Sequence, residues 1–139
     1  MRSHRLTLVA LALLGPLPLA AQGTLEEAAA RARQLWLAHD VAGLVAGSDT
    51  VRLQLPGVTY FAALAPGQAA RLLDRYLEAS KEIGLELKGV RSAGPDQGYA
   101  EGHRRYAVEG TSEEREEMVY LEFRLVGGKW RLREVRIVP

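Results

Sequence analysis

The 139-residue sequence contains no cysteine and only three histidines. Without cysteine, the chain cannot form a disulfide and cannot carry the lipid-modified cysteine of a bacterial lipoprotein. His4 lies in the N-terminal segment, and the two remaining histidines are far apart, so we predict no zinc or other metal site. The serines and glycines show neither a nucleophile elbow nor a phosphate-binding loop. We therefore expect no catalytic residues, no cofactor and no metal.

A long apolar run occurs only near the start of the chain. Two arginines precede the run Leu6–Leu14, and small residues follow at Ala20, Ala21 and Gly23. This three-part pattern predicts a secretory signal peptide over residues 1–22. An uncleaved membrane anchor is the alternative, although the run is shorter than the ~20 residues that a spanning helix needs. We therefore expect a periplasmic or secreted protein.

The mature chain has almost no net charge. The sequence has 18 basic and 17 acidic side chains, and the signal holds Arg2 and Arg5, which leaves 16 basic and 17 acidic side chains. Such a balance excludes a general attraction to nucleic acid or to anionic lipid. We expect no nucleic-acid partner and no membrane contact after signal cleavage. Residues 23–139 are long enough for one domain with its own core.

Two helices and a short helical segment are predicted in the first part of the domain. Residues 24–27 (TLEE) form a capping box, and apolar residues recur at helical spacing as far as His39. Asp40 can cap a short helical segment over residues 41–46. A second helix begins at Pro66, and its apolar stripe extends to Ile83.

Strands make up most of the remaining chain. Residues 50–55 alternate and are predicted as a strand, whereas the apolar residues 58–65 are read as a crossing loop. Further strands are expected at residues 85–88, 99–109, 115–126 and 129–138. In the last strand the apolar parity changes at Arg133–Glu134, which indicates a β-bulge or a strand buried on both faces. The pattern predicts an α+β fold with two to three N-terminal helices packed on a curved antiparallel sheet.

Alternation in the strand 115–126 divides its side chains between two faces. We expect one set to face the helices (Val119, Leu121, Phe123) and the other to face outward (Tyr120, Glu122, Arg124), because a one-residue slip would expose the whole apolar set. The acidic residues 113–117 are expected to pair across strands with the basic last strand (Lys129, Arg131, Arg133, Arg136). The less favoured interpretation makes these charges a docking surface.

The order of elements resembles the NTF2-like superfamily, whose members have a cone-shaped α+β, cystatin-like fold. The resemblance rests on residues 37–57, on PGQAARLLDRYL at residues 66–77, and on residues 119–137. Within that superfamily the chain is similar to DUF4783-like exported bacterial domains, whose recurring pieces here are Gln68-Ala69, Tyr99-Ala100-Glu101-Gly102 and Gly127-Gly128-Lys129-Trp130. These motifs are structural and indicate no activity.

The resemblance also allows the enzyme branches of the superfamily to be compared. Steroid-isomerase-like members carry a carboxylate at the end of the first strand, where this chain has Leu55 before Pro56. They also use a tyrosine from the first helix, which here contains none. These departures argue against a proton-transfer enzyme of that kind.

Two histidines are the remaining candidates for acid–base chemistry. His39 lies beside Asp40, but sequence neighbours on a helix do not face each other, and Asp40 has a sufficient role as a cap. His103 can share a strand face with Glu101. We interpret both histidines as structural, with no catalytic role.

The aromatic residues are the best candidates for binding a ligand. Trp36, Tyr60 and Phe123 are predicted to line a cavity for a small apolar ligand, and the small residues Ala100 and Gly102 leave room beneath the helices. The alternative, which aromatic residues at these spacings favour, is that these rings fill the core.

The superfamily resemblance also implies a homodimer through the outer sheet face, where Tyr120 and Arg124 suit an interface. We therefore expect an exported, non-enzymatic ligand-binding or protein-interaction domain. The alternative is an enzyme with an NTF2-type pocket and an unrecognised site. A void with a buried histidine or carboxylate would favour the enzyme, and an apolar void would favour a carrier.

Overall fold

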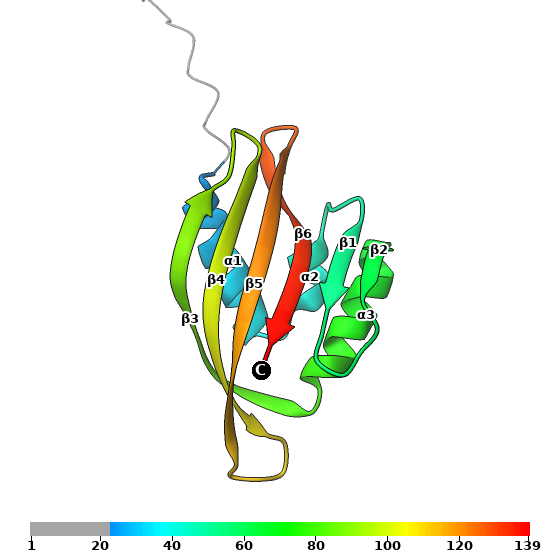
Figure 1. Cartoon of the computed structure of the whole chain (residues 1–139), viewed down its shortest axis with the longest axis vertical. Coiled ribbons are helices and arrows are strands. Elements are labelled where there is room, and N and C mark those ends of the chain that lie inside the picture. Colours follow the sequence, from blue (N-terminus) through cyan, green and yellow to red (C-terminus); the bar gives the residue numbers. More distant parts are fainter. Residues whose placement is uncertain (1–22) are drawn as a thin grey trace, which may run out of the picture.

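A computed structural model describes residues 23–139, so the predicted signal peptide lies outside the described residues. Three helices pack against one side of a single sheet (Figure 1). The helices are α1 (Leu25–Leu37), α2 (Val41–Val45) and α3 (Pro66–Leu77). The strands are β1 (Val51–Gln54), β2 (Phe61–Leu64), β3 (Ser80–Ser92), β4 (Gln97–Val108), β5 (Glu114–Val126) and β6 (Lys129–Val138). The predicted α+β architecture is confirmed.

Local capping sets the start of α1 and of α2, as the sequence predicts. The Thr24 hydroxyl accepts a hydrogen bond from the Glu27 amide at 3.1 Å. The chain then leaves the α1 direction at His39, whose φ of 53° lies in the left-handed region. Asp40 caps α2 by accepting from the Gly43 amide at 2.9 Å. Trp36, in the last turn of α1, is fully buried.

The sheet is mixed, which corrects the prediction of a purely antiparallel one. Its strand order is β2-β1-β6-β5-β4-β3. The four long strands β3 to β6 pair antiparallel with one another, but β1 runs parallel to β6, with Leu53 opposite Val135. The chain travels from β1 to β6 through the whole rest of the fold, and such a long connection permits a parallel pairing. The last strand therefore lies inside the sheet, between β1 and β5.

The helical stripe that we extended to Ile83 ends earlier. Helix α3 stops at Leu77, and β3 begins at Ser80. The Ser80 hydroxyl donates to the Leu77 carbonyl at 2.7 Å, which satisfies an end group of the helix. Pairing of Ser80 with Val108 begins a long ladder along β4, and these hydrogen bonds outweigh a local helical pattern.

A second difference concerns residues 58–65, which we read as a loop. Phe61–Leu64 form β2, an edge strand that pairs antiparallel with β1. Four residues without clear alternation give a weak strand pattern in the sequence, so pairing with β1 decides the conformation. Strand β3 also extends beyond its predicted end, to Ser92 rather than to residue 88. The boundaries of β1, β4, β5 and β6 agree closely with the prediction.

The face assignment of β5 is confirmed. Val119, Leu121 and Phe123 are buried on the helix side. Glu122 is on the outer face, yet its exposed fraction is only 4% because Arg52 and Gln97 both donate to its carboxylate. Opposite this residue, β6 contains the expected bulge, since Glu122 pairs with Glu134 while the next residue of β5 pairs with Leu132.

The acidic segment at residues 113–117 does not pair with the last strand, contrary to our prediction. Because β6 ends opposite Met118, the segment lies beyond it and pairs with β4 instead. Glu117 faces Arg104, and Glu116 lies opposite Arg105. The basic residues of β6 therefore lack these acidic partners.

The space that small residues leave on β4 is occupied by side chains. A Cβ atom on Gly102 would lie 2.8 Å from a methyl carbon of Leu85, and one on Gly98 would overlap Leu25. Close packing of this kind is the normal state of a protein interior. The interior beneath α1 is therefore filled at these positions.

Candidate functional site

A buried polar cluster lies where the last turn of α1 meets β3, β4 and β5. Its centre is Arg104, which has an exposed fraction of 1%. The Arg104 Nε donates to both carboxylate oxygens of Glu82 at 3.0 Å, and its other nitrogens donate to Glu82, Glu117 and Ser80. A buried guanidinium is stable only when such partners replace water.

Aromatic side chains complete this cluster, which we name the Arg104 cluster. The guanidinium carbon lies 5.7 Å from the ring centre of Trp36 and 4.0 Å from that of Tyr106, which are cation–π distances. The Trp36 indole donates to Glu82 at 3.3 Å, and the Tyr76 hydroxyl donates to Glu117. Burial and this hydrogen bond raise the pKa of Tyr76 well above its ordinary value. Burial disfavours the Arg104 charge, but the two carboxylates outweigh it and raise the pKa of Arg104.

His39 borders the Arg104 cluster, whereas its sequence neighbour Asp40 does not. The His39 Nε2 lies 3.2 Å from a Glu82 carboxylate oxygen, and the imidazole is partly exposed. The other histidine, His103, lies on the outer face, which it shares with Glu101 as predicted, and its Nε2 is 3.3 Å from Glu116. Neither partner was foreseen, because both contacts depend on strand register.

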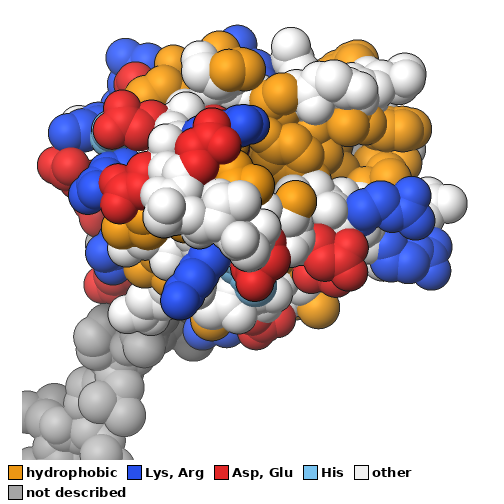
Figure 2. All heavy atoms as spheres, turned by 90° about the horizontal axis from the view of Figure 1, so that it is seen from below, with side chains coloured by type: hydrophobic (Ala, Val, Ile, Leu, Met, Phe, Trp, Pro, Cys, Tyr) orange, Lys and Arg blue, Asp and Glu red, His pale blue; other side chains and the backbone are white. Residues whose placement is uncertain are grey.

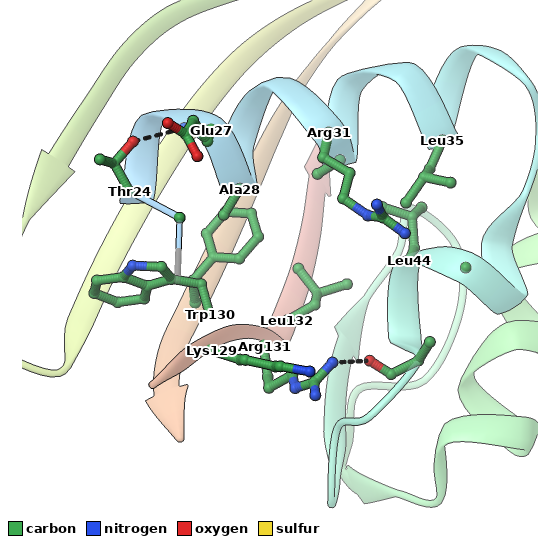
Figure 3. Close-up of a pocket in the computed structure, with 15 residues that line it drawn as sticks. Thr24, Glu27, Ala28, Arg31, Leu35, Leu44, Lys129, Trp130, Arg131 and Leu132 are labelled. Carbon is green, nitrogen blue, oxygen red and sulfur yellow. Dashed lines mark hydrogen bonds between the residues drawn. The ribbon is translucent and has the colours of Figure 1, made fainter. Parts of the chain in front are cut away.

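A pocket of about 400 Å³ opens at the other end of α1, between α1, α2 and the β5–β6 hairpin (Figure 3). Its apolar lining consists of Ala28, Ala32, Leu35, Leu44, Ala46, Phe123, Trp130 and Leu132. We call it the hairpin pocket. Gly127 and Gly128 form the hairpin turn at positive φ, and this turn carries Trp130 back towards α1.

Charged side chains surround this apolar lining. Arg31 extends from α1, while Lys129 and Arg131 extend from β6 (Figure 3). Arg131 donates to the carbonyl of Ala46 at 3.3 Å. Glu27 is the acidic side chain of the lining. The hairpin pocket thus combines an apolar floor with a mainly cationic rim.

A second, larger hollow of about 790 Å³ lies over the outer face of the sheet. Glu101, Tyr120 and Arg136 stand side by side on β4, β5 and β6. The guanidinium of Arg136 lies 4.4 Å from the ring centre of Tyr120. Beside them, burial raises the pKa of Glu134 above its ordinary value, although Arg52 acts in the opposite direction.

The three residues predicted to bind a ligand do not meet in one place. Phe123 lies at the floor of the hairpin pocket. Trp36 is fully buried in the Arg104 cluster, and Tyr60 is 51% exposed in the connection between β1 and β2. Viewed from the end where β6 finishes, hydrophobic side chains gather at the surface (Figure 2). The connection between β1 and β2 also lies at this end (Figure 1). A ligand-binding role for Trp36, Tyr60 and Phe123 remains a prediction.

Several site residues were missed in the sequence. The sequence pattern places Arg104 in a strand and Glu82 in a helix, and it gives neither residue a special role. Burial of their charges depends on strand register, which the neighbouring residues do not reveal. The sequence shows the basic side chains of β6, but their place beside Arg31 in one pocket lining depends on the packing of α1 over the hairpin. Leu55, at the position of a steroid-isomerase carboxylate, is a buried core residue.

Within residues 23–139, no helix is long and apolar enough to cross a membrane. The same part of the chain contains no cluster of three or more acidic or histidine side chains that could hold a metal ion.

Comparison with known proteins identifies the class of fold. No family model matches the chain, and no curated protein matches it in sequence. Among solved structures, a ketosteroid isomerase-like protein from Erwinia carotovora atroseptica has a TM-score of 0.68 at 17% identity, covering 81% of this chain and 91% of its own. An NTF2-like protein with a cystatin-like fold from Novosphingobium aromaticivorans has a TM-score of 0.57 at 21% identity, covering 80% and 76%.

A DUF4783 family protein from Bacteroides uniformis is also similar, with a TM-score of 0.59 at 15% identity over 71% of this chain and 82% of that protein. The chain therefore has the NTF2-like, cystatin-like fold and is structurally similar to DUF4783 proteins. The predicted fold is confirmed. Identities this low establish the fold and no activity.

Proposed function

We propose that this domain is an exported, non-enzymatic binding module whose small ligand occupies the hairpin pocket. The observation that supports the proposal is the apolar floor formed by Phe123, Leu44 and Leu132 beside an open rim. Its volume of about 400 Å³ falls within the range of about 300–1,000 Å³ that small-molecule sites occupy. Burial of an apolar ligand surface there would supply the main driving force for binding.

The test uses phenylnaphthylamine, a neutral dye that becomes fluorescent in apolar surroundings. Ala28→Phe places a ring in the pocket, whereas Ala30→Phe places the same ring on the exposed side of α1. We expect the dye to bind the wild type and Ala30→Phe, and binding to fall at least tenfold in Ala28→Phe. Equal binding by both variants, with unchanged circular dichroism, would contradict the proposal.

A second candidate function is an enzyme, and the contact between His39 and Glu82 is what favours it. A carboxylate that orients an imidazole is a common acid–base arrangement. However, Glu82 already accepts from Arg104 and Trp36, and His39 lines neither the hairpin pocket nor the outer hollow. Any activity that is found should survive His39→Ala. A hundredfold loss with folding intact would support the enzyme instead.

We also propose a weak homodimer through the outer sheet face. The row Glu101, Tyr120, Arg136 places an acid and a base on opposite sides of a tyrosine. A twofold axis through Tyr120 would bring each glutamate towards the arginine of the other copy, so the row is self-complementary. Arg124, the other predicted interface residue, is half-buried on the same face.

A further inference from the structure

We infer that the ligand of the hairpin pocket is a small amphipathic organic anion, with one apolar body and one anionic group. The inference rests on the proposed function and adds the chemical class of the ligand. The apolar body would contact Phe123, Leu44 and Trp130, and the anionic group would meet the basic side chains at the rim.

Three cations converge from two elements on this rim. Arg31 projects from α1 over the opening, and Lys129 and Arg131 approach it from the first residues of β6 (Figure 3). Glu27 is the acidic side chain in the lining, so the charged groups there sum to about +2. An apolar cavity with such a rim is suited to a ligand that carries negative charge at one end.

The rim cations have no acidic partner among the described residues. No carboxylate of residues 23–139 lies within ion-pair distance of Arg31, Lys129 or Arg131. Strand register explains why Lys129 and Arg131 have no acidic partner on the neighbouring strand. Lys129 lies opposite Val126, and Arg131 lies opposite Arg124. Neither basic side chain therefore has an acidic cross-strand neighbour in the described sheet, and both are available to a bound anion.

Arg131 is held in position without using all its donors. One terminal nitrogen donates to the Ala46 carbonyl, which orients the guanidinium towards the pocket. A guanidinium has five N–H donors, so the others remain available for a carboxylate, sulfonate or phosphate. Lys129 and Arg31 are exposed and can adjust to the ligand, in contrast to the Arg104 guanidinium, whose donors are already engaged.

The experiment compares two dyes with the same aromatic body. Anilinonaphthalene sulfonate carries an anionic group, and phenylnaphthylamine lacks it. We expect the sulfonate to bind at least tenfold more tightly at low salt, and its advantage to shrink as salt screens the rim. Energy transfer from Trp130, checked with Trp130→Phe, locates the dye in the hairpin pocket.

Substitutions at the rim then assign the advantage to named side chains. Arg31→Gln and Lys129→Gln should each weaken binding of the sulfonate several-fold and leave binding of the neutral dye unchanged. Arg131→Gln should have the largest effect. Arg71→Gln, an exposed arginine on α3, is the matched control and should change neither dye. Because Arg31 and Lys129 are exposed, their variants should fold even if Arg131→Gln does not.

The outcomes separate the two proposals. If both dyes bind the pocket equally, the proposed function stands and the anionic class is wrong. If the sulfonate binds more tightly but its affinity is unaffected by all three rim substitutions, the dye binds elsewhere and the inference is overturned. If neither dye binds, both proposals fail.

Discussion

Helix α1 contributes to two regions that contain arginine. In one region the guanidinium is buried and paired with carboxylates, and in the other the basic side chains are exposed and have no acidic partner among the described residues. At the C-terminal end, Arg104 is buried and donates to Glu82 and Glu117. Beside the hairpin pocket, Arg31 and Lys129 are exposed, and no carboxylate of residues 23–139 pairs with them. The contrast indicates a structural role for the first region and a binding role for the second.

The energetic consequences of the two arrangements also differ. Removing one partner of a buried ion pair leaves an uncompensated charge, whereas an exposed cation contributes little to stability. Substitutions at the Arg104 cluster should therefore change the free energy of unfolding, and substitutions at the pocket rim should change ligand affinity.

Arg104→Met should destabilise the domain by about 3–5 kcal/mol, because Glu82 and Glu117 would lose the cation that compensates their buried charge. Urea unfolding followed by circular dichroism measures the change. The control Arg71→Met, at an exposed position on α3, should stay within about 0.5 kcal/mol.

Replacing the two carboxylates as well sharpens this test. Arg104→Met combined with Glu82→Gln and Glu117→Gln removes the stranded charges and should recover part of the loss. A loss below about 1 kcal/mol for Arg104→Met alone would show that the Arg104 cluster does not hold these elements together.

Phe123→Ala should cost about 3 kcal/mol, at the low end of the range of about 3–5 kcal/mol for a buried phenylalanine. The ring packs against the core on one side, but it borders the hairpin pocket on the other, so part of its surface has no packing partner to lose. Thermal and urea unfolding measure the change. A loss near 5 kcal/mol would indicate a filled pocket.

Leu121→Ala provides the comparison on the same strand and face, where the side chain is buried and does not line the hairpin pocket. We expect a cost of about 2–5 kcal/mol there, without an effect on dye binding. Phe123→Ala should instead alter dye affinity together with stability.

Tyr76→Phe should change how stability depends on alkaline pH. In the folded protein the pKa of Tyr76 lies above its ordinary value of 10.0, because burial and the hydrogen bond to Glu117 disfavour the phenolate. The contribution of Tyr76 to the free energy of unfolding is fully present below pH 10. It decreases as the pH rises above 10, by up to about 1.4 kcal/mol per pH unit, because the tyrosine ionises more readily in the unfolded chain. The stability difference between wild type and Tyr76→Phe should therefore shrink above about pH 10. Parallel stability curves would contradict the assignment.

Features that depend on neighbouring residues could be predicted from the sequence. The Thr24 cap, the turn at Gly127-Gly128 and the bulge beside Glu134 each follow from a few adjacent side chains. The start of β3 at Ser80 and the parallel contact of β1 with β6 could not be predicted in this way. Those features depend on hydrogen bonds to segments distant in sequence, which override local propensity.

The candidate sites show the same limit. Phe123 was assigned to the interior because alternation on β5 fixes its face. The Arg104 cluster was missed, since it needs the register of three strands and the last turn of α1. The sequence shows the basic residues of the last strand, which form part of the cationic rim. The position of Arg31 beside them is known only from the structure.

The smallest expected effect on stability concerns the outer sheet face. Tyr120→Glu should change the free energy of unfolding by less than about 1 kcal/mol, because the side chain is half-buried on the face away from the core. It should nevertheless weaken the proposed dimer, since a new carboxylate beside Glu101 would replace the central tyrosine of the self-complementary row. Sedimentation velocity over a range of protein concentrations measures the shift towards monomer. Tyr60→Glu, at an exposed tyrosine between β1 and β2, should leave sedimentation unchanged. A wild type that remains monomeric at every concentration, or a Tyr120→Glu variant that still dimerises, would exclude this face as the interface.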